Sequence, residues 1–401
     1  MALRPTLDFL KTEAGGGAAL ALAALAGFVL ANSPWAHAYF SAVGADFTIQ
    51  LGGFSETLTI KAWIKDGLMA VFFFVVGLEI KQEVLKGELS SPRKLALPVA
   101  AAIGGMLAPA LVYLAFNLGA GGARHGWPIP TATDIAFALA ALALVGRGLP
   151  QSLRIFLLAM AIADDLGAVA LIGVLFTSQI HIWPLAGAAV TLIGLVALSE
   201  WKDAPFLLRA VGFLVLGAFT LKSGINTSLA GVAAALTVPI GPRRPGQEAV
   251  LKHFMRSLHP YVAYGVLPLF ALTTAGVSLA GVSPRDLLGP VPLGIAAALL
   301  LGKQTGVLAA IWIAIRSGVA RRPTGATWLE LYGVATLCGI GFTLSLFLAA
   351  LAFPGEGPIS TQAALGVVAG SLLSAGLGAG VLAIAAARRR RLRAEDEDQD
   401  G

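Results

Sequence analysis

Two adjacent aspartates, Asp164 and Asp165, lie near the middle of an apolar stretch, IFLLAMAIADDLGAVALIGVLF (155–176). About 20 apolar residues form a helix that crosses a hydrocarbon core of roughly 30 Å, so the stretch predicts a membrane-spanning helix. A charge at mid-membrane costs roughly 2.5–3.5 kcal/mol on insertion scales, and neighbouring residues point about 100° apart around a helix. An acidic pair at this depth is typical of a site that handles cations or protons.

Two further ionisable residues lie deep in apolar stretches: Asp134 in PIPTATDIAFAL and Lys303 in LGIAAALLLGKQTGVLAAIW. Inserting all four groups unpaired would cost on the order of 10 kcal/mol, which is comparable to the stability of a whole domain. We therefore expect these groups to be paired or to face a water-filled cavity. An ion pair between Lys303 and one acid of the 155–176 span is the simplest arrangement.

Two spans carry signals of interruption. Pro128 and Pro130, followed by threonines, precede Asp134, and Gly339 and Gly341 lie within TLCGIGFTLSLF. Interrupted helices in corresponding positions of two halves indicate the ion site of a transporter. Their ends at mid-membrane carry partial charges, which Asp134 and Lys303 would compensate. Close helix packing is the alternative explanation for the two glycines.

The composition indicates a polytopic α-helical membrane protein. Of the 401 residues 57% are hydrophobic and only 12% charged, whereas soluble domains carry about 25% charged residues. The mean hydropathy is +0.81. Apolar runs near 20 residues exclude an outer-membrane barrel. A single cysteine, Cys338, excludes a disulfide framework, and no phosphate loop or zinc motif occurs, so neither an enzyme nor a cofactor is expected.

About twelve spans are predicted in one transmembrane domain, residues 1–387. An alternating segment at 46–60 predicts a small extramembrane β-hairpin, and the charged tail 388–401 is predicted to be disordered. The spans cover about 14–31, 63–85, 95–117, 130–145, 155–176, 182–199, 206–221, 225–240, 261–279, 291–315, 329–353 and 361–387.

The distribution of basic residues sets the orientation. With twelve spans, 22 of the 28 lysines and arginines fall on the side of the two termini and five on the other side, while Lys303 lies within a span. Basic residues accumulate on the cytoplasmic side of membrane proteins, so both termini are predicted to be cytoplasmic. Since the basic residues lie in separate loops, nucleic acid is not an expected partner.

The chain resembles the bacterial NhaA-type sodium/proton antiporters over nearly its whole length. The matching stretches are MAVFFFVVGLEIKQE (69–83), AAIGGMLAPALVYLAFN (101–117), PTATDIAFAL (130–139), IADDLGA (162–168), LKSG (221–224), LHPYVAY (258–264) and CGIGFT (338–343). The resemblance implies inverted repeats made by the third to fifth and tenth to twelfth spans, with the fourth and eleventh discontinuous. It also implies a homodimer in the bacterial inner membrane, held partly by the hairpin.

The resemblance also implies roles for individual residues. Asp164 and Asp165 are expected to carry Na⁺ (or Li⁺) and H⁺ with Thr133 as a further ligand, Asp134 to compensate the helix ends, and Lys303 to pair with Asp164. Glu79, Lys81 and Glu83 match a pH-responsive group, and His253 and His259 are further candidates. Two positions depart from the family pattern, Asn226 in place of a histidine and Met255 in place of an acid.

The expected function is exchange of cytoplasmic Na⁺ for external H⁺ by alternating access, electrogenic and regulated by pH. Oxygen ligands suit the hard sodium ion. Burial disfavours a charged carboxylate while a neighbouring ammonium favours it, so protons and sodium compete for the acids. An intramembrane aspartyl protease would also use two aspartates, Asp134 and Asp165, but leaves Lys303 without a role. A cation channel or a proton-coupled symporter could also use acids at this depth.

Overall fold

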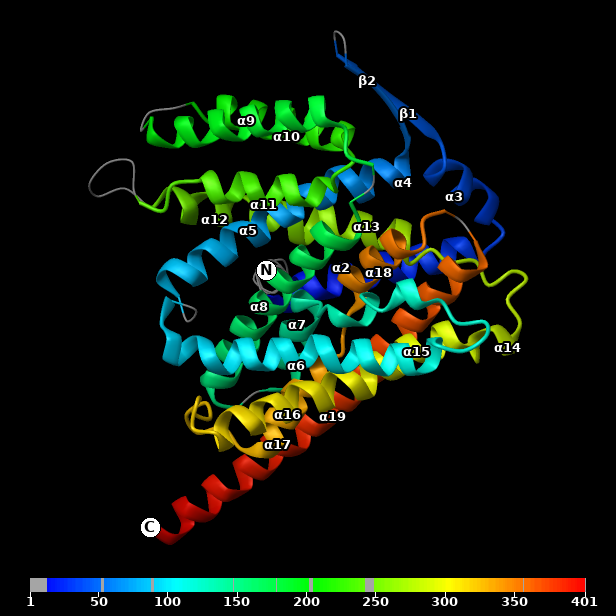
Figure 1. Ribbon diagram of the computed structural model, residues 1–401. Helices are drawn as coiled ribbons and strands as arrows, with labels where there is room; N and C mark the ends of the chain where they lie inside the picture. The colour runs from blue at the N-terminus through cyan, green and yellow to red at the C-terminus, as the bar shows by residue number, and fades with distance from the viewer. Residues whose placement is uncertain are drawn as a thin grey trace, which may run out of the picture. The chain divides into compact units, whose positions relative to one another are not determined.

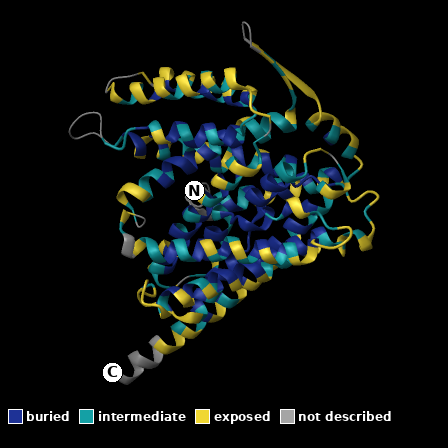
Figure 2. Cartoon of the chain, viewed as in Figure 1, coloured by how far each residue is buried: buried dark blue, intermediate teal, exposed yellow. Residues whose placement is uncertain are grey.

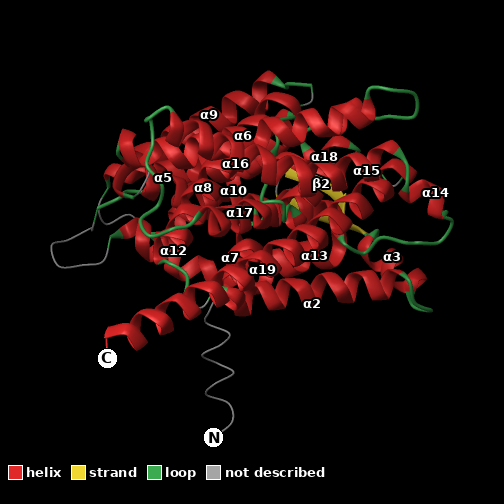
Figure 3. Cartoon of the chain, turned by 90° about the horizontal axis from the view of Figure 1, so that it is seen from below, coloured by secondary structure: helices red, strands yellow, loops and turns green. Residues whose placement is uncertain are grey.

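The structure, a computed structural model, describes residues 13–51, 54–87, 90–146, 148–177, 179–201, 205–241, 249–355 and 357–400. Helices dominate these residues, and the β-structure within them is one two-stranded antiparallel sheet (Figure 3). The chain forms two compact units from interleaved stretches of sequence. Unit 1 contains residues 1–19, 88–168 and 279–401, and unit 2 contains residues 20–87 and 169–278.

Unit 1 consists of helices that pack lengthwise. In Figure 1, α16 (Lys303–Arg316) lies along α6 (Pro92–Asn117), and α15 (Pro290–Ala297) and α17 (Trp328–Leu337) lie along α19 (Pro358–Asp400). Gly104 and Gly306 let α6 and α16 approach closely, because a Cβ on either would collide with the backbone carbonyl of the other. The remaining elements are α7 (Ile135–Val145), α14 (Pro284–Leu287), α18 (Phe342–Ala352), most of α8 (Gln151–Leu175), and the short turns η3 (Arg124–Gly126), η4 (Ile129–Thr131) and η6 (Ala298–Gly302).

Unit 2 carries the β-hairpin. Strands β1 (Asp46–Leu51) and β2 (Phe54–Thr59) pair antiparallel, with Asp46 opposite Thr59, so the predicted hairpin at 46–60 is confirmed. In the same unit α5 (Met69–Lys86) packs against α11 (Thr227–Thr237), and α9 (Ile182–Glu200) against α10 (Phe206–Ser223). The other elements are α3 (Ala36–Val43), α4 (Ile60–Trp63), η1 (Ile64–Leu68), α12 (Val250–Tyr261), η5 (Val262–Val266), α13 (Leu267–Thr274), and most of α2 (Glu13–Ala31).

Large apolar side chains face outward on several helices. Ile182, Trp183 and Val190 of α9 are 72%, 85% and 68% exposed, and exposed residues recur along α9 and α10 in Figure 2. Within the described residues five helices are long and apolar enough to cross a membrane, or eight if each of three bent helix pairs forms one span. These features are those of a polytopic membrane protein, while the count of twelve spans stays a prediction.

Two boundaries differ from the sequence expectation. The helix over the predicted 261–279 span begins and ends earlier than expected, because α12, η5 and α13 run without a break from Val250 to Thr274. The tail expected to be disordered from residue 388 instead continues α19 to Asp400. Arginine, leucine, alanine and glutamate have high helix propensity, and no glycine or proline interrupts residues 381–400.

Candidate ion site

The acidic pair lies on α8, where both carboxylates are buried. Asp164 is 1% and Asp165 2% exposed, and Lys303 is fully buried at 0%. The Nζ of Lys303 donates to Oδ2 of Asp164 at 2.6 Å and to the backbone carbonyl of Thr131 at 2.5 Å. The structure therefore places the ion pair of the site between Lys303 and Asp164.

A π-helical turn precedes Lys303. Residues Ala298–Gly302 form η6 between α15 and α16, in a helix that otherwise runs from Pro290 to Arg316. A π turn holds one residue more than an α turn, and such turns within helices are frequent at functional sites. Gly302 is required there, because a Cβ at this residue would lie 2.7 Å from Cα of Pro109. The turn sets the direction in which the Lys303 side chain leaves the helix.

Both predicted interruptions are present, and they contact each other. The helical segments on either side of residues 132–134 are bent by 41°, and α17 and α18 by 42° about residues 338–341. The backbone N–H of Asp134 donates to the carbonyl of Ile340 at 2.6 Å. The Thr133 hydroxyl donates to the carbonyl of Cys338 at 2.9 Å. Backbone groups released by one interrupted helix are thus satisfied by the other, as the absence of water in a hydrocarbon core requires.

The Asp134 carboxylate accepts hydrogen bonds from the N-terminal turns of two helices. Its Oδ1 accepts from the backbone N–H of Phe137 in α7 at 3.1 Å. Its Oδ2 accepts from the N–H of Thr343 in α18 at 3.0 Å and from the Thr343 hydroxyl at 2.5 Å. A negative charge at the positive end of a helix is favourable, so the geometry suits the expected compensation of helix ends.

Sequence reasoning missed several polar groups around the α17–α18 break. Ser371 of α19 accepts from the N–H groups of Gly341 and Phe342 at 3.2 and 3.1 Å, and so caps α18 from outside. The hydroxyl of Thr336 donates to the side chain of Gln304, the residue after Lys303. Thr343 lies within CGIGFT, which was the one available signal; serine and threonine in apolar helices usually bond their own backbone and give no sign of a distant partner.

The oxygen atoms around Asp164 suit a small hard cation. Its Oδ1 is buried and accepts no hydrogen bond from the residues that the structure describes. The Thr133 side chain lies close to the same carboxylate, and Asp165 follows on α8. Carboxylate, hydroxyl and carbonyl oxygens are the ligands that hard cations prefer, whereas transition metals prefer nitrogen and sulfur. The Oδ1 oxygen of Asp164 is therefore open to a further partner of the hard-cation class.

The expected pH-responsive residues lie in unit 2. Glu79 and Glu83 are four residues apart on α5, and His253 and His259 are exposed on α12. The Nζ of Lys81 donates to the carbonyls of Leu236 and Val238 at 2.5 and 2.8 Å, and thereby caps the C-terminal end of α11.

The two positions that depart from the family pattern have local roles. The Asn226 side chain accepts from the N–H of Ser228 at 3.0 Å and caps the start of α11. Met255 packs against an apolar cluster that includes Leu78, Leu251 and Phe254. Asn226 and Met255 therefore both have structural roles in unit 2.

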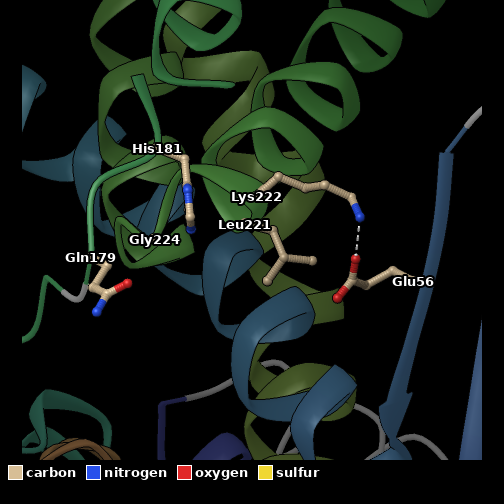
Figure 4. Close-up of a pocket in the computed structure, with 6 residues that line it drawn as sticks. All are labelled: Glu56, Gln179, His181, Leu221, Lys222 and Gly224. Atoms are coloured by element: carbon tan, nitrogen blue, oxygen red, sulfur yellow. Dashed lines mark ion pairs between the residues drawn. The ribbon is translucent and has the colours of Figure 1, made fainter. Parts of the chain in front are cut away.

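A separate cavity of about 510 Å³ lies beside the hairpin in unit 2 (Figure 4). Lys222 forms an ion pair with Glu56 at 2.6 Å across it and donates to the carbonyl of Ser55 at 3.1 Å. Gln179, His181, Leu221 and Gly224 complete the lining. None of the predicted ion-binding residues lines this cavity, and the two contacts of Lys222 join the hairpin to the end of α10.

Comparison with known proteins matches residues 7–382 to a family described as Na⁺/H⁺ antiporter 1. The Na⁺/H⁺ antiporter NhaA 2 of Pseudomonas syringae pv. syringae is 50% identical over 379 residues, which cover 93% of each chain. The Na⁺/H⁺ antiporter NhaA of Rhodospirillum rubrum is 47% identical over 388 residues, covering 94% of this chain and 96% of the relative. The Na⁺/H⁺ antiporter NhaA 1 of Syntrophotalea carbinolica is 44% identical over 379 residues, covering 94% and 95%.

Proposed function

The chain belongs to the Na⁺/H⁺ antiporter 1 family and exchanges Na⁺ for H⁺ across a membrane, and we propose that Asp164 and Asp165 carry both ions. The observation that carries this proposal is the buried Lys303–Asp164 ion pair, in which one carboxylate oxygen has no hydrogen-bond donor among the described residues. A cation that reaches this oxygen competes with the ammonium for the same carboxylate.

Competition at one carboxylate couples the two ions. Sodium binds to Asp164 and Asp165, with Thr133 and carbonyls of the interrupted backbone as further oxygen ligands. Its positive charge displaces two protons from the group formed by Asp164, Asp165 and Lys303. The site carries either sodium or protons across, never both. One net charge then moves per cycle, and an inside-negative potential, worth about 2.3 kcal/mol per charge per 100 mV, drives sodium out.

The interrupted helices give alternating access its framework. Asp134 neutralises the N-terminal ends of α7 and α18, so the two interrupted helices leave no uncompensated partial positive charge at mid-membrane. Interruptions in the fourth and eleventh of twelve spans support inverted repeats made by the third to fifth and tenth to twelfth spans. The excess of basic residues on one side supports cytoplasmic termini in a bacterial inner membrane.

The remaining features of the proposal concern pH regulation, the oligomeric state and the transport of lithium. We assign Glu79, Glu83, His253 and His259 of unit 2 to the pH response, with Lys81 fixing α11. The hairpin formed by β1 and β2 joins two copies in a homodimer, and lithium is accepted at the same oxygen ligands as sodium. These assignments follow the family resemblance and the position of these residues on α5 and α12.

Protease chemistry fits the site less well. An aspartyl protease needs two carboxylates that share a proton and hold a water. Both oxygens of Asp134 instead accept hydrogen bonds from α7 and α18, so this carboxylate is not disposed to share a proton with Asp165.

The test uses purified protein in sealed vesicles with a proton gradient. Addition of sodium should move lumenal pH in the wild type, as a pH-sensitive dye reports, and should not do so in Asp165→Asn. Asp286→Asn, a change at an acid of the short helix α14, is the matched control and should exchange like the wild type. Wild-type exchange in Asp165→Asn would contradict the proposal that both acids of the pair carry the ions.

A further inference from the structure

The end of α19 is fixed to the start of α17 by a charged contact. Arg389 donates through Nε and Nη2 to the two oxygens of Glu330, at 2.9 and 3.1 Å. Nη2 also donates to the carbonyl of Gly325, in the turn before α17, at 2.5 Å. Glu330 is only 1% exposed. The bidentate geometry therefore holds the end of α19 against the loop that joins α16 to α17.

This contact brings two groups of arginines to one end of unit 1. Arg321 and Arg322 lie four and three residues before Gly325, hence within about 14 Å of it at the reach of an extended chain. A hydrogen bond from the N–H of Ala320 to the carbonyl of Ala314 folds the same loop back on α16, which ends at Arg316. On α19 the neighbours of Arg389 are further arginines.

Six arginines at this end are exposed and carry no ion-pair partner among the side chains that the structure describes. They are Arg316, Arg321, Arg322, Arg388, Arg390 and Arg391. Since successive helical residues point about 100° apart, Arg388, Arg390 and Arg391 cover the sides of α19 that Arg389 leaves open. Figure 2 shows exposed residues on this part of α19 before the grey end of the helix.

Aromatic residues mark the same level of the molecule. Trp312 of α16, one turn before Arg316, is 56% exposed, and Trp328, the first residue of α17, is 40% exposed. Tryptophan is enriched where a membrane protein passes from hydrocarbon to headgroups. The apolar part of α19 also ends directly before Arg388. These arginines thus lie at headgroup depth.

We propose that the six arginines form a basic collar that binds the phosphate headgroups of anionic phospholipids. Guanidinium groups bind phosphate through two parallel hydrogen bonds, and arginines next to a membrane span attract anionic headgroups. The acidic run EDEDQD (395–400) follows in the sequence and weakens the long-range field, so direct contact holds the lipid. The collar is independent of the ion site and rests only on the proposed cytoplasmic placement of the termini.

The test compares lipids by their effect on thermal unfolding of the purified full-length protein in detergent. Phosphatidylglycerol should raise the unfolding temperature more than phosphatidylcholine does, and added salt should reduce the difference. Inorganic phosphate at the same concentration should have no such effect; an equal effect would mean binding of a free anion and would overturn the lipid assignment. Equal shifts with the two lipids would also overturn it.

Variants locate the effect. Changing all six collar arginines to glutamine should abolish most of the extra shift in unfolding temperature. Two half-collar variants serve if the full variant does not fold, and each should lose part of the shift: Arg316/Arg321/Arg322→Gln and Arg388/Arg390/Arg391→Gln. Arg124→Gln with Arg285→Gln, on the opposite predicted side, should keep the whole shift. A half-collar variant that retains the wild-type response contradicts the proposal, and Asp165→Asn should respond like the wild type even though it cannot exchange ions.

Discussion

Asp134 and Asp164 are both buried acids of unit 1, 4% and 1% exposed, but they are held in different ways. Asp134 accepts three hydrogen bonds, all from α7 and α18, and both of its oxygens are engaged. Asp164 has one oxygen on Lys303, and its other oxygen has no hydrogen-bond donor within the described part of the chain. The contrast is between an acid whose two oxygens are both engaged and an acid that has one oxygen open to a new partner.

The energetics support this contrast. Hydrogen bonds to a charged group contribute about 1.5–3 kcal/mol each, so a carboxylate with three donors is firmly held in one position. A buried ion pair gains less, because the desolvation of two charges offsets their attraction. The proposed exchange of partners at Asp164 is consistent with this balance, because a cation that takes the place of the ammonium keeps the buried carboxylate compensated.

The largest expected effect comes from exchanging each acid for its amide. Asp164→Asn should abolish sodium-dependent proton movement in vesicles, because the site loses its charge. Asp134→Asn should keep much of it, since asparagine caps a helix about as well as aspartate. If Asp134→Asn abolished exchange and Asp164→Asn retained it, the roles given to the two acids would have to be reversed.

Removing the partner of the exchangeable acid should lower stability. Lys303→Met leaves Asp164 buried without its counter-charge, which costs about 3–5 kcal/mol. The double variant Lys303→Met/Asp164→Asn buries no charge there and should recover most of the loss. Thermal unfolding of the four proteins completes a double-mutant cycle; additive effects would show that the two side chains are not coupled.

A smaller change affects the fixed acid. Thr343→Val removes the hydroxyl donor to Asp134 and should destabilise the protein by about 1–3 kcal/mol. Thr343→Ser retains the hydroxyl and is the matched control. Chemical denaturation measures both; wild-type stability in Thr343→Val, which keeps the methyl group and lacks only the hydroxyl, would show that the hydrogen bond to Asp134 does not stabilise the fold.

The smallest effect is expected at the outer cap of α18. Ser371→Ala removes the acceptor for the N–H groups of Gly341 and Phe342 and should cost about 0.5–2 kcal/mol, as for other helix caps. Ion exchange should persist, because the Ser371 hydroxyl bonds to the backbone N–H groups of Gly341 and Phe342 rather than to either acid of the ion site. Loss of exchange with unchanged stability would place Ser371 in the ion site instead.

The sequence predicts the charged members of the site because charge in an apolar span has few explanations. Asp164, Asp165 and Lys303 were recognisable for this reason, and Gly339 and Gly341 disclosed the second interruption. Thr343 and Ser371 gave no comparable signal, since hydroxyl residues are tolerated in apolar helices at little cost. Their partners come from segments that only the folded chain brings together.

The same limitation applies to the tail. A run of like charges usually indicates disorder. Arg389 nevertheless forms an ion pair with the buried Glu330, about sixty residues earlier, and α19 continues past Arg389. The local composition is compatible with disorder, because it is highly charged, and equally with a helix, because arginine and glutamate form helices readily. The tertiary contact with α17 is what sequence patterns do not reveal.

The π-helical turn at Ala298–Gly302 has a consequence for how this protein can vary. Such a turn is equivalent to a single inserted residue, so a one-codon deletion within it would restore a regular helix. The same deletion would rotate everything before it by about 100° relative to Lys303. The residues of α15 that pack on α19 would then face elsewhere, or Lys303 would turn away from Asp164. The length of this segment is therefore constrained, as is the glycine at residue 302.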